Sequence, residues 1–112
     1  MKVYSEKFTS EIMIIKLNDR VDTFSAPDLR AHFSNLLSQG RSNFIVDLTA
    51  ATFLDSAGLA ALVKLLKDSR EKGGDVKIIL PENKNVQRIF SLTKFDRVFD
   101  IQPTVPIAVG AF

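Results

Sequence analysis

The residues most able to support chemistry in this sequence lie in one short segment, Asp55-Ser56-Ala57-Gly58. A carboxylate and a hydroxyl stand side by side there, directly before an apolar helical pattern. One interpretation is that Asp55 or Ser56 caps the helix, since the first N–H groups of a helix lack partners and either residue satisfies them, for about 1 kcal/mol. The other is that the hydroxyl accepts a phosphoryl group, whose charge the positive end of a helix tolerates. From the residue types alone, capping is the favoured interpretation.

Gly58 adds a second signal to the same segment. Glycine inside a helix costs about 0.8–1 kcal/mol relative to alanine, so the sequence predicts that another group approaches closely at this position. Ala57, Ala60 and Ala61 give the first turns little bulk. The hydroxyl of Ser56 would therefore be open to another protein.

The rest of the sequence does not support enzymatic use of Ser56. A serine hydrolase needs a Gly-x-Ser-x-Gly elbow and a histidine base, whereas the single histidine, His32, falls at the border of an apolar helix face between Leu29 and Leu36. We expect His32 to be partly buried and structural. The chain lacks a Gly-x-Gly-x-x-Gly turn for a dinucleotide, and one histidine with scattered carboxylates makes no metal site. The sequence therefore predicts no catalytic residue, no cofactor and no metal.

Strand-like and helix-like patterns alternate along the chain and must position this segment. Strands are predicted over residues 3–8, 12–17, 44–48, 76–80 and 98–101, with a turn at Thr9-Ser10, a break at 18–20 and a short return at Val21-Asp22. Helices are predicted from about residue 25 to Gly40, from 56 to 72 and from 83 to 92, with a final helical turn or two within residues 104–112.

The order of these elements predicts the fold class. Strand–helix–strand occurs three times in a row, which favours parallel pairing through right-handed crossovers. We therefore expect an α/β fold with a mixed, mostly parallel β-sheet, helices packed on it, and an added N-terminal strand or hairpin. In such sheets functional groups gather where strand-to-helix turns meet helix N-termini. Two turns qualify, Asp22-Thr23-Phe24-Ser25 and residues 54–59, and the second is the sharper candidate.

The start of the first helix carries its own signal. Ser25 and Asp28 resemble a capping box, with Asp in place of the usual Glu, and Pro27 lies in the first turn. Leu29, Phe33 and Leu36 then recur at helical spacing on one apolar face.

Composition limits the classes of protein that this chain can represent. Its 112 residues are 46% hydrophobic and 25% charged, with a formal net charge of +2 and no cysteine. These values are typical of one globular domain, and they exclude a disordered tail and a disulfide scaffold. No apolar run reaches the roughly 20 residues of a membrane span, and the N-terminus does not resemble a signal peptide. No basic stripe indicates direct binding of nucleic acid. We expect a cytoplasmic single domain.

The nine phenylalanines are explained by packing rather than by a nucleic-acid platform. Most fall at positions that face the expected core, such as Phe33, Phe44 and Phe90. Phe24 and Phe95 are the two that we expect to be exposed at a partner surface.

The residues around Ser56 resemble a known family. Phe53-Leu54-Asp55-Ser56-Ala57-Gly58-Leu59, preceded by Phe44-Ile45-Val46-Asp47-Leu48, resembles the signature of the anti-sigma factor antagonists, the single-domain STAS proteins. Val21-Asp22 resembles the acidic position before the family's first helix, and residues 73–76, 86–93 and 95–99 resemble later parts of its pattern. The resemblance covers roughly residues 3–101 and implies a single STAS domain over residues 1–112. It also reverses the ranking of the two interpretations of Ser56.

This resemblance implies a phosphorylation switch without enzymatic activity of its own. In the family, the unphosphorylated protein binds an anti-sigma factor that is also a serine kinase of the histidine-kinase-like ATPase type, and this frees the sigma factor. The kinase phosphorylates the serine that matches Ser56, the complex dissociates, and a metal-dependent serine phosphatase resets the switch; ATP belongs to the partner. The resemblance thus implies phosphorylation at Ser56. It also implies a partner-binding face of Asp22, Thr23, Asp55, Ser56, Ala57, Gly58 and Leu59.

Two positions depart from the family pattern and bear on the identity of the partner. Ala60 stands where glycine is common, and Asp19 stands in a turn that often carries glycine. The alternative function is that of a STAS scaffold or signalling module, which recruits other partners and does not act on a sigma factor. We expect a monomer, because no long exposed apolar helix stripe is left over.

Overall fold

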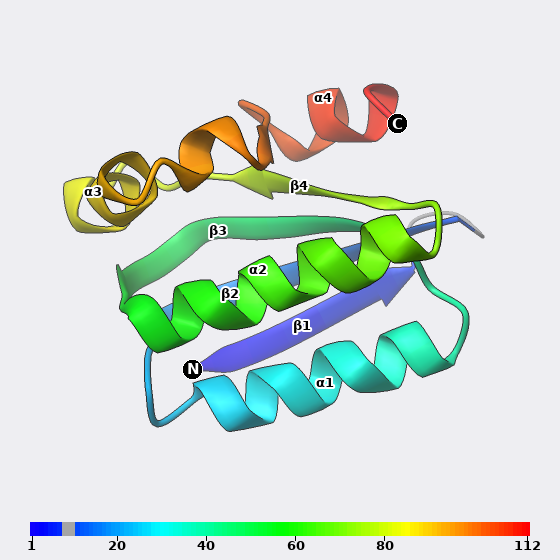
Figure 1. The fold of residues 1–112 in the computed structure, drawn as a ribbon. Helices are drawn as coiled ribbons and strands as arrows, with labels where there is room; N and C mark the ends of the chain where they lie inside the picture. The colour runs from blue at the N-terminus through cyan, green and yellow to red at the C-terminus, as the bar shows by residue number, and fades with distance from the viewer. Residues whose placement is uncertain (8–10) are drawn as a thin grey trace.

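The computed structural model describes residues 1–7 and 11–112, and five strands form one sheet in the order β1-β2-β3-β4-β5. The strands are β1 (Lys2–Lys7), β2 (Ile12–Val21), β3 (Asn43–Leu54), β4 (Asp75–Ile79) and β5 (Asp100–Ile101). β1 pairs with β2 in antiparallel register, and every other pairing is parallel. The predicted mixed, mostly parallel sheet with an added N-terminal strand is therefore confirmed (Figure 1).

Four α-helices and one 3-10 turn connect and cover these strands. They are α1 (Ala26–Ser38), α2 (Ser56–Glu71), α3 (Lys84–Leu92), the 3-10 turn η1 (Phe95–Arg97) and α4 (Val105–Gly110). α1 and α2 lie side by side and roughly antiparallel to the neighbouring strands, as connections between parallel strands require (Figure 1).

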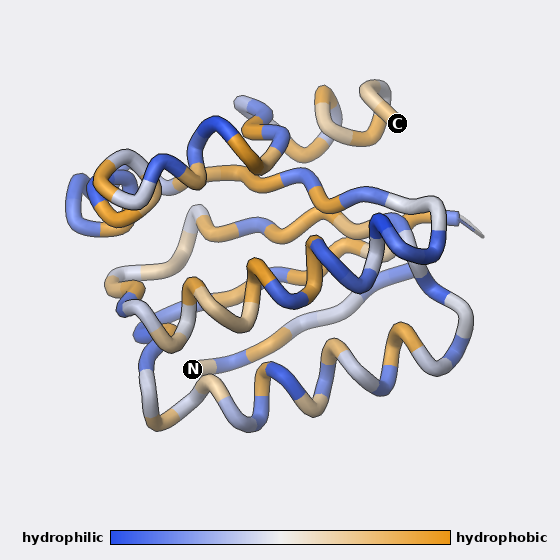
Figure 2. The backbone as a smooth tube through the Cα atoms, viewed as in Figure 1, coloured by the Kyte–Doolittle hydropathy of each residue, from blue (hydrophilic) through white to orange (hydrophobic). Residues whose placement is uncertain are grey.

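Two apolar clusters hold the layers together, one on each face of the sheet. Because side chains alternate along a strand, Phe44 and Val46 face the larger cluster, which α1, α2 and α3 cover, while Ile45 faces the smaller one. α4 covers the smaller cluster through Ala108. Figure 2 shows the hydrophobic residues concentrated along the strands and on the helix sides that face them. This packing fixes the strand ends, where the candidate site lies.

A buried cation lies beside α4 at the other end of the sheet. The Lys77 ammonium contacts an Asp100 carboxylate oxygen at 2.6 Å and lies 4.4 Å from the centre of the Phe112 ring. The hydrogen bond and the charge of Lys77, with a further hydrogen bond from Gln102, outweigh the opposing effect of burial and keep the pKa of Asp100 below its usual value. The lysine is thus satisfied by a structural ion pair.

The prediction that the strand ends at residues 18–20 is wrong. β2 continues through them to Val21, with register shifts against β3 between Lys16 and Asn18 and between Asp19 and Arg20. Asp19 adopts a left-handed backbone with φ of 58°, and such irregularities bend a strand without ending it. Glycine adopts this left-handed backbone readily, which explains why glycine is common at the position of Asp19 in the family pattern.

The predicted capping box at the start of α1 is also wrong. Ser25 is the first non-helical residue before α1, but its side chain makes no cap bond to the helix. The Ser25 hydroxyl instead accepts a hydrogen bond from the backbone N–H of Asp22 at 2.9 Å. Pro27 does lie in the first turn, as predicted, and Gly40 follows the helix end with φ of 87°.

The boundaries of two further predicted strands also differ from the structure. β3 extends six residues beyond the predicted end at Leu48, so residues 49–54 are strand rather than connection. The last strand contains only Asp100 and Ile101, because the backbone N–H groups of Val98 and Phe99 donate to the Phe95 carbonyl in the turn after η1. The predicted turn at Thr9-Ser10, and Phe8 of the first predicted strand, lie outside the described residues. His32 is half-buried on α1 and pairs with the Ser5 hydroxyl, as a structural histidine would.

Candidate functional site

The turns that follow β2 and β3 meet and are joined by hydrogen bonds. The backbone N–H of Asp55 donates to the Val21 carbonyl at 3.2 Å. The backbone N–H and the hydroxyl of Thr23 both donate to Asp55 Oδ2, at 2.9 and 3.0 Å. The two candidate turns predicted from the sequence thus form one continuous surface at the carboxyl ends of neighbouring strands.

Asp55, and not Ser56, caps α2. Its Oδ1 accepts a hydrogen bond from the backbone N–H of Gly58 at 2.9 Å. Burial raises the pKa of Asp55, but the hydrogen bonds from Gly58 and Thr23 outweigh it and leave the pKa below its usual value. The carboxylate is therefore ionised at neutral pH, and both of its oxygens are engaged.

Gly58 is required by the close approach that the sequence predicted. A Cβ atom at this position would lie 2.4 Å from the Val21 carbonyl oxygen and 2.7 Å from Leu54 Cδ1. The neighbour is thus the chain's own backbone at the end of β2. Gly58 brings the first turn of α2 against the other loop of the site.

Ser56 is exposed at the first position of α2. Among the described residues, no hydrogen bond to its hydroxyl is formed, and the side-chain cap of α2 comes from Asp55 instead. The Ser56 side chain is therefore exposed to solvent and not used in the cap of α2. Of the two residues that the sequence offered as the cap, the structure uses Asp55 and not Ser56.

Asp22 organises the other loop. Its Oδ1 accepts hydrogen bonds from the backbone N–H groups of Phe24 and Ser25, at 3.0 and 3.1 Å, and its Oδ2 lies 3.3 Å from Arg20 Nε. The bond from Ser25 is the main cause that keeps the pKa of Asp22 below its usual value. This Asx-type turn leaves the Phe24 side chain 93% exposed, which confirms the predicted exposure.

The other predicted contact residues differ in how much they can reach a partner. Thr23 is exposed and Ala57 is half-buried, whereas Gly58 and Leu59 are buried. The two buried residues support the shape of the surface from beneath. Phe95, the other suspected surface phenylalanine, is half-buried and packs on the core.

An open groove beside Ser56 contains residues that the sequence analysis did not assign to the site. Its α2 wall includes Ala60, Val63, Lys64 and Lys67 in addition to Ser56 and Leu59, and its other wall is formed by Thr93 and Phe95. The helical spacing of the α2 residues was visible in the sequence. No signal in the sequence indicated that Thr93 and Phe95 line this groove, because only tertiary packing brings them next to α2.

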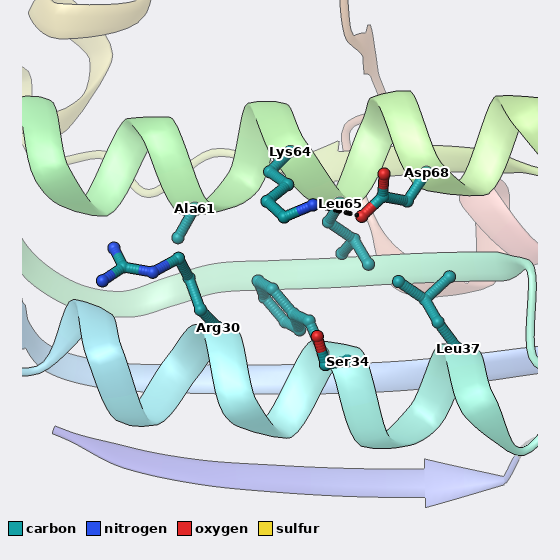
Figure 3. Close-up of a pocket in the computed structure, with 8 residues that line it drawn as sticks. Arg30, Ser34, Leu37, Ala61, Lys64, Leu65 and Asp68 are labelled. Atoms are coloured by element: carbon teal, nitrogen blue, oxygen red, sulfur yellow. Dashed lines mark hydrogen bonds and ion pairs between the residues drawn. The ribbon is translucent and has the colours of Figure 1, made fainter.

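The described side chains of α1 and α2 leave almost no free space between these helices. The pocket between α1 and α2 holds only about 10 Å³, and the Lys64–Asp68 ion pair closes one side of it (Figure 3). That volume is close to the space of a single water. Across the described ranges, no three His, Cys, Asp or Glu side chains gather where they could hold a metal. None of the described helices has the length and apolar character to cross a bilayer.

Comparison with known proteins identifies the family. The model of the STAS domain matches residues 5–108, so this chain belongs to the STAS domain family. A Thermotoga maritima protein named "Putative anti-sigma factor antagonist" is 26% identical over 108 residues, covering 96% of this chain and 95% of that protein. A Bordetella bronchiseptica protein with the same description, BtrV, is 26% identical over 113 residues, covering 100% of this chain and 95% of that protein.

Solved structures confirm the STAS fold. An anti-sigma factor antagonist from Mycobacterium paratuberculosis has a TM-score of 0.86 at 22% identity, covering 98% of this chain and 92% of that one. SpoIIAA in its unphosphorylated form has a TM-score of 0.84 at 19% identity, covering 96% and 93%. SpoIIAA of Bacillus in the phosphorylated form has a TM-score of 0.77 at 19% identity, covering 98% of each chain.

Proposed function

We propose that this chain is an anti-sigma factor antagonist whose partner binding is switched off by phosphorylation of Ser56. The unphosphorylated chain binds an anti-sigma factor that is also a serine kinase of the histidine-kinase-like ATPase type, and the sigma factor is freed. The kinase transfers the γ-phosphoryl group of ATP to Ser56 Oγ and releases ADP, while the hydroxyl proton passes to a base on the kinase. A metal-dependent serine phosphatase hydrolyses the phosphoester and restores the hydroxyl.

The observation that carries this proposal is the exposed Ser56 hydroxyl at the start of α2, which the described residues leave without a hydrogen bond. The cap is supplied by Asp55, so phosphorylation removes no bond that holds the helix. The names of the relatives from Thermotoga maritima and Bordetella bronchiseptica support the same role.

Electrostatics explains how the phosphate would release the partner. A phosphoserine carries about −1.5 to −2 charges at neutral pH, and it would lie beside the ionised Asp55, whose pKa is below its usual value of 3.8. A surface that accepted a neutral hydroxyl would then have to desolvate the new charge. The helix N-terminus tolerates that charge, so the switch needs no refolding.

The domain spans residues 1–112, has no enzymatic activity and acts in the cytoplasm, where the ATP of the kinase is available. Asp22, Thr23, Asp55, Ser56 and Ala57 form the face that meets the kinase, with Gly58 and Leu59 beneath it.

The test uses the full chain as bait in a lysate of its source organism supplied with ATP. Wild type, Ser56→Ala and Ser56→Asp are compared with Ser34→Ala, which removes an exposed serine on α1. We expect peptide mapping to find phosphate at Ser56 in wild type and in Ser34→Ala but none in Ser56→Ala. Ser56→Ala should retain the anti-sigma factor, and Ser56→Asp should bind it at least roughly tenfold more weakly, about 1.4 kcal/mol.

Two results would contradict the proposal. Equal binding of Ser56→Ala and Ser56→Asp would remove the electrostatic switch. Capture of larger STAS assemblies, with no phosphate on Ser56 and no anti-sigma factor, would instead support the scaffold alternative.

A further inference from the structure

We propose that the groove between α2 and the segment after α3 receives an amphipathic helix of the partner, with an acidic residue near its N-terminal end. An apolar side chain of that helix lies between Ala60 and Phe95, and the acidic residue faces Lys67. The inference rests on the proposed function, because Ser56 lines one end of the same groove. It adds the kind of structure that the partner presents.

The apolar part of the groove is held rigidly by aromatic packing. Phe95 lies 6.3 Å from Phe99 between ring centres, and Phe99 lies 5.8 Å from the buried ring of Phe90 in an edge-to-face arrangement. Opposite this wall, Ala60 is exposed and has the smallest side chain that a helix surface can carry apart from glycine. A small residue facing a fixed ring lets a partner side chain enter without reordering the protein.

The charged residues of the groove indicate which polar residue the partner helix carries beside its apolar side chain. Lys64 is committed to an ion pair with Asp68, with 2.9 Å between nitrogen and oxygen. Lys67 is exposed, and none of the described residues forms an ion pair with it. A carboxylate on the partner would complement this lysine, whereas a basic partner residue would be repelled.

The walls favour a helix over an extended segment. An added strand needs free backbone groups along an edge, but the backbone of α2 is used within the helix. In the other wall, the Lys94 N–H donates to the Ser91 carbonyl and the Phe95 carbonyl accepts from Val98 and Phe99. A partner helix brings its own backbone hydrogen bonds and needs only side-chain contacts. Ser56 and Lys67 lie about 16 Å apart along α2, a length that about 11 helical residues match.

The direction of the partner helix follows from the same charges. Acidic residues are favoured in the first turn of a helix, so the carboxylate that meets Lys67 places the N-terminal end there. The C-terminal end, with its partial negative charge, then lies near Ser56 and the positive end of α2. A phosphate on Ser56 would repel the negative C-terminal end of the partner helix. Phosphorylation of Ser56 would therefore weaken binding in the groove.

The test measures binding of the anti-sigma factor kinase captured in the experiment above, purified and used as the probe. Ala60→Trp fills the groove, Lys67→Glu reverses its charge, and Lys16→Glu is the matched control on β2, exposed and outside the groove. All three positions are exposed, so we expect unchanged thermal unfolding. We expect both groove variants to raise Kd at least roughly tenfold and the control to stay within about twofold.

A photo-crosslinker at Ala60 then locates the partner segment, which should be a helix with an acidic residue near its N-terminal end. Reversing that acidic residue to lysine should restore binding of Lys67→Glu. Normal Kd values for both groove variants, or a crosslink to a non-helical segment, would overturn the groove while leaving the Ser56 switch intact. If Ala60→Trp weakens binding but Lys67→Glu does not, the proposed contact between Lys67 and an acidic residue of the partner is wrong. If wild type captures no anti-sigma factor, the proposed function fails and the inference falls with it.

Discussion

At the scale of single residues, Asp55 determines the geometry around Ser56. Its carboxylate caps α2 through Gly58 and holds Thr23 through two further hydrogen bonds. We expect Asp55→Ala to lower the free energy of unfolding by about 1 kcal/mol or more, the usual value of a lost cap. Asp55→Asn is the matched variant, because asparagine still caps a helix but has one carbonyl oxygen instead of two acceptors. Urea unfolding should place it between wild type and Asp55→Ala.

The difference in unfolding free energy between wild type and Asp55→Asn should depend on pH in a definite direction. The hydrogen bonds keep the pKa of Asp55 in the folded chain below its usual value of 3.8. The ionised carboxylate therefore stabilises the fold above that usual value, and this contribution is lost as the pH falls through the lower, folded-state pKa. The stability gap between wild type and Asp55→Asn should narrow in acid. A gap that widens there would show that the carboxylate is not held in its ionised form.

Sequence reasoning located these residues because their signals are local. A carboxylate, a hydroxyl and a glycine within four positions indicate a helix start whatever lies nearby, but they do not say which side chain makes the cap. That choice depended on Asp55 reaching Gly58 while Thr23, distant in the sequence, used its second oxygen. The same limit hid Thr93 and Phe95, which join the site only through tertiary packing.

At the scale of elements, the contact between the start of α2 and the end of β2 is the tightest point of the site. We expect Gly58→Ala to destabilise the protein by about 1–3 kcal/mol, since its Cβ would lie 2.4 Å from the Val21 carbonyl. Gly110→Ala is the control, because nothing lies within 4 Å of a Cβ there and its φ is not in the left-handed region. Alanine's helix propensity should make that variant neutral or slightly stabilising. Equal thermal unfolding of the two variants would contradict the close approach.

The inward face of α2 anchors it on the sheet. Leu62 is fully buried in the larger apolar cluster, so Leu62→Ala should lower the free energy of unfolding by about 2–5 kcal/mol. Ala60→Leu changes the size of a side chain two residues earlier, on the exposed side of the same helix, and serves as control, with an expected effect near zero. Urea denaturation measures both. A Leu62→Ala effect as small as the control would mean that the helix packs on another face.

The elements themselves were predictable where periodicity was strong. The apolar repeat gave α2 to within one residue of its end at Glu71. It fails at Asp19, where the sequence predicts a break: this left-handed residue lies inside β2, because pairing with β3 continues through the irregularity. It failed again at Ser25, where the competing turn formed by Asp22 takes the hydroxyl that a capping box would use.

At the scale of the whole molecule, the sheet edges decide whether copies of the chain associate. A free strand edge invites pairing with another chain, and charged side chains along it oppose this. β1 forms one edge and carries Lys2, Glu6 and Lys7, all exposed, while β5 at the other edge is only two residues long. The large exposed apolar side chains lie on separate elements, among them Tyr4 on β1, Phe24 after β2 and Ile107 on α4. Within residues 1–7 and 11–112, no edge or patch thus favours a second copy.

We therefore expect the unphosphorylated protein to be a monomer of 12.5 kDa. Size-exclusion chromatography with light scattering at two concentrations measures this directly, and a mass near twice that value would contradict it. The matched variant replaces Glu6 and Lys7 with valine, which removes charge from the β1 edge and leaves its strand pattern. It should associate as concentration rises, because the edge then offers unpaired backbone groups without the charges that oppose pairing. A monomeric antagonist keeps the Ser56 surface and the α2 groove available to one kinase at a time.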